Sequence, residues 1–288
     1  MTIQNIAVIG SGLMGRGIAH VAALGGYRTT VVDISDQILH KALGNIRSEM
    51  DKAVSLGKLT SEQKDKALSL LIPETELEKA AQAADLVIEA IPEDMKLKID
   101  TFTRLDKAAP EHTVFASNTS SMSITEMAAV TDRAALFCGM HFFNPVHKMK
   151  LLEIVTGLET TPDVVKIAEE VGRKMGKETV VVRESPGFIT SRINAMIGNE
   201  AFYMLESGVA TATDIDKALK LGLNHPMGPF EMVDLVGLDT RLHVLEYLHA
   251  TLGEKFRPCP LMVQYVKAGR LGRKAGRGVY DYTAEKKA

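Results

Sequence analysis

The first two thirds of the chain alternate short apolar runs with longer amphipathic stretches. The alternation extends from Ile3 to about Val182, and turn residues bound the apolar runs. This order is typical of β-α units arranged around a largely parallel sheet. The pattern therefore predicts α/β structure, with strands at residues 3–9, 29–32, 86–90, 114–117, 135–140, 151–155 and 179–182.

A long polar and charged stretch separates the second predicted strand from the third. Residues 34 to about 71 have a helical pattern that is interrupted near Gly57. Thr60, Ser61 and Glu62 follow the interruption, and such a group is typical of a helix N-terminus. The stretch is therefore predicted to form a helical hairpin.

The last third of the chain has a different pattern. After residues 184–187, Glu-Ser-Pro-Gly, the strand signal disappears, and residues 188–207, 213–220 and 232–252 have helical patterns. The 288 residues, 45% of them hydrophobic, also exceed the usual size of one core, about 100 to 200 residues. We therefore expect two domains, residues 1–184 and an all-helical domain of residues 185–288.

A glycine-rich turn follows the first predicted strand and opens a helix. Gly10 permits a tight turn, Gly12 lets the backbone approach a pyrophosphate, and Gly15 lets the helix pack closely on the sheet. Asp33 ends the second strand, where a carboxylate accepts hydrogen bonds from ribose hydroxyls and repels a 2′-phosphate. The alternative interpretation is a structural glycine turn and a surface aspartate, neither of which binds a nucleotide. Together these features predict a Rossmann-type domain that binds NAD through Gly10, Ser11, Gly12, Leu13, Met14, Gly15 and Asp33.

Composition and charge exclude several kinds of partner. Lysine and arginine total 34 against 36 aspartates and glutamates, a net charge of -2, so no global field favours nucleic acid or anionic lipid. No apolar run reaches the ~18 residues of a membrane span, and no targeting signal is visible. Cys138 and Cys259 match neither a disulfide framework nor a metal site. We expect a cytoplasmic protein with no nucleic-acid or membrane partner and no metal.

Two strand ends carry side chains suited to alcohol oxidation. Residues 117–121, Ser-Asn-Thr-Ser-Ser, follow one apolar strand, and residues 139–145, which include His141, end another. Open α/β sheets bind ligands at such strand ends. An imidazole titrates near neutral pH and suits the transfer of a hydroxyl proton, and Glu153 would fix its tautomer. An isolated histidine is more often structural, so the neighbouring motifs decide the interpretation.

Six motifs together resemble one family. They are residues 10–17, 89–91, 117–121, 141–145 (His-Phe-Phe-Asn-Pro), 185–188 and 225–229 (His-Pro-Met-Gly-Pro). The chain resembles the short-chain (S)-3-hydroxyacyl-CoA dehydrogenases over nearly its entire length. The resemblance implies the reversible, NAD-linked oxidation of a short-chain (S)-3-hydroxyacyl-CoA to the 3-oxoacyl-CoA, in a homodimer built by the helical domain.

The resemblance also implies roles for single residues. His141 matches the family's base and Glu153 its partner, while Ser120 and Asn144 match residues that lie against cofactor and substrate. Alternatives remain: Glu93 and Lys98 suit ordinary surface charges, Lys274 suits a solvated tail, and nothing in the spacing of His147 indicates a role. The family residues near the cofactor match Glu93, Lys98, Ser120, Asn144 and Lys274.

The chain departs from the family pattern at the substrate. Ser191 replaces an asparagine that contacts the substrate oxygen, and Asn194, one helical turn later, is the alternative. Glu49 and Leu56 replace the serine and lysine that bind the coenzyme A phosphates. Three nearby cations suit either a phosphate or a solvated helix face: Arg47, Lys52 and Lys58.

Two other functions therefore compete with the acyl-CoA dehydrogenase. One is a dehydrogenase of a free 3-hydroxy or sugar acid, as in the related lambda-crystallin-like enzymes. The other is a nucleotide-binding structural protein without turnover, which has no need of His141 and Glu153. The apolar residues 229–238 suit a dimer interface or an internal core equally well.

Overall fold

The structure is a computed structural model in which residues 1–283 are described. The chain divides into two compact units, the first spanning Met1–Glu184 and the second beginning at Ser185. Each unit has its own hydrophobic core.

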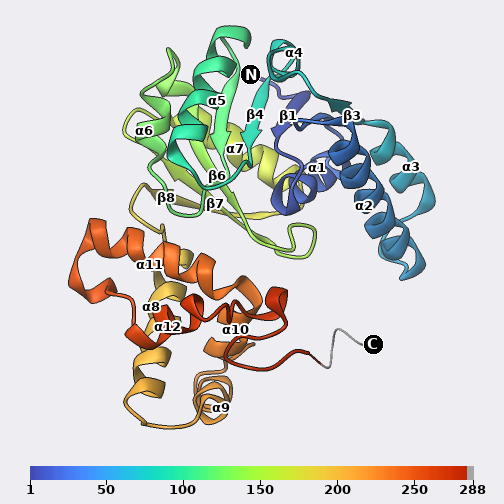
Figure 1. The fold of residues 1–288 in the computed structure, drawn as a ribbon. Helices are drawn as coiled ribbons and strands as arrows, with labels where there is room; N and C mark the ends of the chain where they lie inside the picture. Colours follow the sequence, from blue (N-terminus) through green and yellow to red (C-terminus); the bar gives the residue numbers. More distant parts are fainter. Residues whose placement is uncertain (284–288) are drawn as a thin grey trace. The chain divides into compact units, whose positions relative to one another are not determined.

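The first unit is built on an eight-stranded sheet with the order β3-β2-β1-β4-β5-β6-β7-β8 (Figure 1). The strands from β3 to β6 run parallel, β7 is antiparallel to β6, and β8 is parallel to β7. The strand order reverses at β1, which lies between β2 and β4, and sheets of this kind bind ligands at the carboxyl ends of the strands beside such a reversal. The strands are β1 (Asn5–Ile9), β2 (Arg28–Val32), β3 (Leu71–Glu74), β4 (Leu86–Glu89), β5 (Val114–Ser117), β6 (Phe137–Phe142), β7 (Leu151–Thr156) and β8 (Glu178–Arg183).

Helices cover both faces of the sheet, because successive strand side chains point to opposite sides. Val114 and Ala116 belong to a core shared with α1, α2 and α7. Phe115, between them, packs with Phe102 of α5 and Phe137 instead. One layer contains α1 (Leu13–Leu24), α2 (Asp36–Ser55), α3 (Ser61–Ser69) and α7 (Pro162–Lys174); the other contains α4 (Leu77–Gln82), α5 (Met95–Ala108) and α6 (Ile124–Ala128).

The predicted helical hairpin is present as α2 and α3, which lie side by side in Figure 1. Thr60 Oγ1 accepts a hydrogen bond from Gln63 N at 3.1 Å, and Thr60 N donates to Gln63 Oε1 at 2.9 Å. This reciprocal pair is a capping box, which satisfies two backbone donors at the start of α3. The prediction of a helix N-terminus at Thr60 is confirmed.

Two strand predictions need correction. Strand β3 was not predicted; it has four residues and contains Pro73, which an edge strand tolerates because one side of it needs no ladder hydrogen bond. The strand predicted at residues 135–140 begins at Phe137, because Ala134–Leu136 form a 3-10 turn, and it continues to Phe142. His141 therefore lies inside a strand, not beyond its end.

The described part of the second unit is helical, as predicted. The helix predicted at residues 232–252 is in fact two helices, because Gly237 has a φ of 104°, which a right-handed helix does not accommodate. Phe230 and Val233 are buried in the helical core, whereas Leu235 and Val236 are exposed. The helices are α8 (Thr190–Glu206), α9 (Ala212–Gly222), α10 (Pro229–Val236), α11 (Leu238–Leu252) and α12 (Pro260–Lys267). Over residues 1–283, none of the helices has the length and apolarity that a bilayer crossing needs.

Candidate active site

The glycine turn lies between the carboxyl ends of β1 and β4. Gly10 has a φ of 92° and donates from its N–H to Val32 O at 2.8 Å. A Cβ on Gly15 would lie 1.7 Å from Gly10 O, so the turn and the start of α1 are in direct contact. A Cβ on Gly12 would meet no atom of the described chain within 4 Å. The turn is therefore tight on its inner side and open at Gly12.

The open side of the turn carries the features that a dinucleotide needs. Within residues 1–283, no side chain caps the first turn of α1, so the backbone N–H groups there lack a side-chain acceptor. Asp33 Oδ2 accepts from Ser11 N at 2.7 Å and from Ser11 Oγ at 2.6 Å, which holds a carboxylate beside the turn. Donors for a pyrophosphate and an acceptor for a ribose therefore lie together, and these residues fit NAD.

His141 and Glu153 form a buried pair on neighbouring strands. They are directly opposed in the antiparallel register of β6 and β7. His141 Nδ1 lies 2.8 Å from Glu153 Oε2, and the two side chains are 7% and 1% exposed. The ring of His141 also contacts the ring of Phe143, with centroids 4.4 Å apart. An imidazole oriented through Nδ1 by a carboxylate can exchange a proton at Nε2, as a general base requires.

A second buried network joins the ends of β4 and β5. Lys98 Nζ lies 2.6 Å from Glu89 Oε1 and 3.3 Å from Glu93 Oε2, and its side chain is 1% exposed. Glu89 Oε2 accepts from Ser117 Oγ at 2.6 Å. Burial raises the pKa of Glu89, and the Lys98 ammonium opposes this effect. Lys98 is thus no ordinary surface charge; its ammonium is held in place by two glutamates near the carboxyl ends of β4 and β5.

Ser120 is attached to this network through Glu93. Glu93 Oε1 accepts from Ser120 N at 2.7 Å and from Ser120 Oγ at 3.1 Å. Asn144 is exposed and is the second residue after the end of β6, and its peptide bond to Pro145 is cis. Glu93, Ser120 and Asn144 therefore follow the carboxyl ends of β4, β5 and β6, and β6 also carries His141.

Sequence reasoning assigned no role to three residues that order this edge. Glu89 and Ser117 build the Lys98 network, and Asn118 Oδ1 accepts from Phe142 N at 2.9 Å, beside His141. A glutamate at the end of the apolar run of β4 is the signal that identifies Glu89, because a buried charge requires a partner.

Five further residues predicted for the site belong to the second unit or to the region of α2. Ser191 is in the first turn of α8, and Lys274 Nζ pairs with Asp239 Oδ1 at 2.6 Å; both belong to the second unit. Arg47 and Lys52 are exposed residues of α2, and Lys58 is exposed after its end. Arg47 and Lys52 are five residues apart, which places them about 140° apart around the axis of α2. These two cations therefore do not share one helix face.

Comparison with known proteins decides the family. Residues 5–185 match the family described as 3-hydroxyacyl-CoA dehydrogenase, NAD binding domain, and residues 187–282 match the C-terminal domain of the same family. The chain belongs to the 3-hydroxyacyl-CoA dehydrogenase family. The predictions of an oxidoreductase and of NAD as its cofactor are therefore confirmed.

Similar family members span bacteria and mammals. The probable 3-hydroxybutyryl-CoA dehydrogenase of Bacillus subtilis is 44% identical over 283 residues, which cover 98% of each chain. The mitochondrial hydroxyacyl-coenzyme A dehydrogenase of mouse is 42% identical over 97% of this chain and 91% of its own. A crystal structure of (S)-3-hydroxybutyryl-CoA dehydrogenase from Ralstonia eutropha has a TM-score of 0.94 and 42% identity, and covers 98% of this chain and 99% of the other.

Proposed function

We propose that this protein catalyses the reversible, NAD-dependent oxidation of a short-chain (S)-3-hydroxyacyl-CoA, such as 3-hydroxybutyryl-CoA, to the 3-oxoacyl-CoA. The observation that carries the proposal is the His141–Glu153 pair, 2.8 Å apart, on the sheet whose β1 leads into the glycine turn. The substrates named for the Bacillus and Ralstonia relatives support the short acyl chain.

In this mechanism His141 takes the proton of the 3-hydroxyl group, and bound NAD would supply the acceptor for the hydride of the same carbon. Glu153 orients the imidazole through Nδ1, so that Nε2 receives the proton, and its negative charge stabilises the imidazolium that forms. In the reverse direction His141 returns the proton to the 3-oxo oxygen. Ser120 and Asn144 orient the reacting groups.

The cofactor is held by the first unit. Gly12 leaves room for the pyrophosphate, the first turn of α1 supplies N–H donors, and Asp33 accepts from the ribose. Lys98 and Glu93 form a preorganised charged edge beside Ser120. The full set proposed to bind NAD is Gly10, Ser11, Gly12, Leu13, Met14, Gly15, Asp33, Glu93, Lys98, Ser120, Asn144 and Lys274.

The second unit is proposed to complete the acyl-CoA site and to form a homodimer. Ser191 at the start of α8 is the candidate for the substrate oxygen, and the exposed Leu235 and Val236 of α10 support an apolar interface. Arg47, Lys52 and Lys58 remain the proposed cations for the CoA phosphates. The buried thiols Cys138 and Cys259 suit the reducing cytoplasm, where we propose that the protein acts.

The substrate is tested by following NADH oxidation with acetoacetyl-CoA and, separately, with free acetoacetate. We expect turnover of the thioester and at least about 100-fold lower kcat/KM for the free acid, because a CoA binding site would contribute several kcal/mol. Efficient turnover of the free acid alone would support the free-acid dehydrogenase instead. Absence of turnover with both, despite NADH binding, would support a non-catalytic protein.

The cofactor preference is tested at Asp33. An Asp33→Ser variant is expected to lose NADH affinity and to gain use of NADPH, because the carboxylate that repels a 2′-phosphate is removed. The ratio of kcat/KM for the two cofactors measures the change. Equal use of NADPH by the unaltered protein would contradict the role proposed for Asp33.

A further inference from the structure

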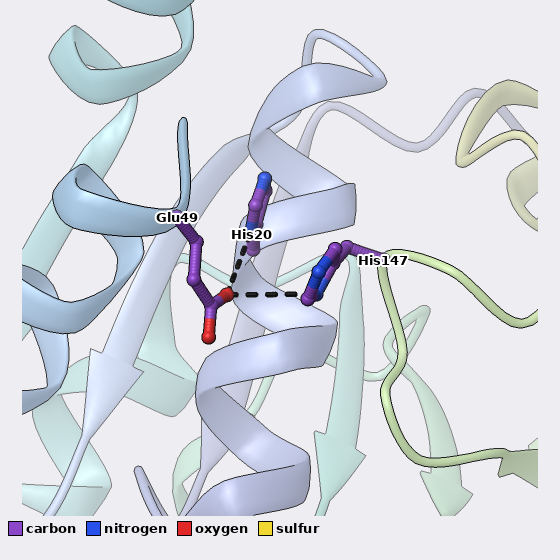
Figure 2. A group of neighbouring side chains, drawn as sticks. All are labelled: His20, Glu49 and His147. Atoms are coloured by element: carbon purple, nitrogen blue, oxygen red, sulfur yellow. Dashed lines mark hydrogen bonds and ion pairs between the residues drawn. The ribbon is translucent and has the colours of Figure 1, made fainter. Parts of the chain in front are cut away.

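A second group of histidine and glutamate side chains joins three elements of the first unit. Figure 2 shows His20 of α1 and His147 of the β6–β7 loop directed at the same carboxylate oxygen of Glu49 in α2. Glu49 Oε2 lies 3.3 Å from His20 Nδ1 and 3.5 Å from His147 Nδ1. None of these residues takes part in the proposed dehydrogenase mechanism.

The spacing of these three groups suits a tetrahedral metal ion. Ligand atoms 2.0–2.1 Å from a zinc ion are about 3.4 Å apart in a tetrahedron, and the two distances to Glu49 bracket this value. All three ligand atoms lie within 4.8 Å of one another. His147 therefore has to move toward His20 by about 1.4 Å at most to complete the geometry. Its side chain is 27% exposed and lies in a loop, so such a movement displaces little of the core.

The backbone around His147 is positioned before any ion binds. Lys177 Nζ donates to Val146 O and to Met149 O, the latter at 2.9 Å, so both sides of His147 are tied to the start of β8. A Cβ on Gly17 would lie 2.8 Å from Val146 Cγ2, which shows how closely α1 approaches the loop. The rings of His20 and His147 are stacked with centroids 5.4 Å apart. Contacts with α1 and with Lys177, at the start of β8, therefore position the loop that carries His147.

The chemistry of the ligands also suits zinc. Two imidazoles and one carboxylate form a donor set that zinc uses, with a fourth position for water, whereas Mg²⁺ prefers oxygen ligands. Arg16 Nη2 lies 4.0 Å from Glu49 Oε1 and orients the carboxylate, although its charge and that of Lys177 oppose a cation.

We propose that His20, Glu49 and His147 form a binding site for a divalent transition-metal ion of the zinc type. The ion would link α1, which begins at the glycine turn, to α2 and to the loop that follows the His141 strand. It would act by stabilising the first unit and not by taking part in hydride transfer.

Metal binding is measured on the full-length, tag-free chain after treatment with EDTA and dialysis. Titration with Co²⁺, followed by visible absorption, is expected to show one tetrahedral ion per chain, which Zn²⁺ displaces. Zinc at about 100 times its Kd should raise the Tm by roughly 5 to 10 °C, whereas Mg²⁺ at the same concentration should leave the Tm unchanged. Absence of stoichiometric binding, or an equal effect of Mg²⁺, would overturn the proposal.

Two variants locate the bound ion. Glu49→Gln and His147→Gln, at half-exposed positions, should each weaken zinc binding at least about tenfold, because each removes a ligand. His112→Gln is the matched control: its side chain is exposed and pairs with Asp85 at 3.2 Å, but without a second histidine in that pair. The proposal would be overturned if zinc binding survived in both Glu49→Gln and His147→Gln. It would also be overturned if His112→Gln lost zinc binding to the same extent. In either case the ion binds elsewhere, and the three side chains form only a hydrogen-bonded contact.

Discussion

The first unit contains two histidine–glutamate groups that the chain positions in different ways. His141 and Glu153 are directly opposed on adjacent strands, so the backbone ladder of the sheet fixes both Cα atoms, and both side chains are almost fully buried. His20, Glu49 and His147 come from two helices and a loop, and the Glu49 side chain remains 30% exposed. A sheet register holds one imidazole at hydrogen-bond distance from one carboxylate, which suits proton transfer.

The helix–loop cluster is more open, and this difference has a chemical consequence. Its two histidine–carboxylate distances are 3.3 and 3.5 Å, longer than the 2.8 Å of the strand pair. Such distances make weak hydrogen bonds but match the spacing of ligands around a metal ion. The same residue types thus support a proton carrier in one place and a candidate ion site in the other.

The largest effect is expected for His141→Gln. Loss of the general base should lower kcat by about 10²- to 10⁴-fold with acetoacetyl-CoA and NADH, whereas NADH affinity and zinc binding should be retained. Steady-state kinetics, a fluorescence titration with NADH and the cobalt titration measure the three properties. His112→Gln is the control for each assay. A simultaneous loss of zinc binding would show that the two histidine groups are not independent.

Glu153→Gln is expected to have the next largest effect. The amide can keep a hydrogen bond to His141 but cannot stabilise the imidazolium, so kcat should fall on the order of 10²-fold with little change in KM. Glu254, which pairs with His249 at 3.1 Å on the surface, provides the control variant Glu254→Gln. If Glu153→Gln behaved like this control, Glu153 would be a structural residue only.

Lys177→Met tests how far the helix–loop cluster depends on the position of the loop that carries His147. Loss of the ammonium leaves the carbonyl groups of Val146 and Met149 without this donor, so the free energy of unfolding should fall by about 1–3 kcal/mol. Zinc affinity should also fall, because the loss of the contacts that position His147 should outweigh the removal of the Lys177 charge, which opposes a cation. Urea unfolding in EDTA, with Lys166→Met at an exposed position as the control, measures the first effect. Unchanged zinc affinity in a destabilised Lys177→Met would separate the loop contact from the ion site.

The smallest effect is expected for Glu49→Gln in the absence of metal. Its contacts with His20, His147 and Arg16 are long and partly exposed, so the free energy of unfolding should change by about 1 kcal/mol or less. When zinc is added, the difference in the free energy of unfolding between Glu49→Gln and the unaltered chain should grow. Only the unaltered chain is stabilised by the free energy of zinc binding. A loss of several kcal/mol in EDTA would indicate instead that Glu49 is primarily structural.

Local patterns predicted much of the first unit. The apolar runs predicted seven of its strands, and the Thr60 cap correctly located the restart of the hairpin. The patterns failed where neighbours decide the structure: β3 is a strand only because β2 offers it a partner, and Gly237 divides a continuous helical pattern. Short elements have little local signal, so tertiary contacts determine them.

The sequence by itself predicted the candidate nucleotide site, because the glycine turn and Asp33 depend on backbone geometry and a nearby strand end, which local residue types specify. It also supplied the motifs by which His141 and Glu153 are identified. Only the tertiary structure decided that Lys98 is buried between Glu89 and Glu93, and that Glu49 meets His20 and His147. These contacts join segments far apart in the chain, and their geometry arises only when sheet order and helix packing bring those segments together.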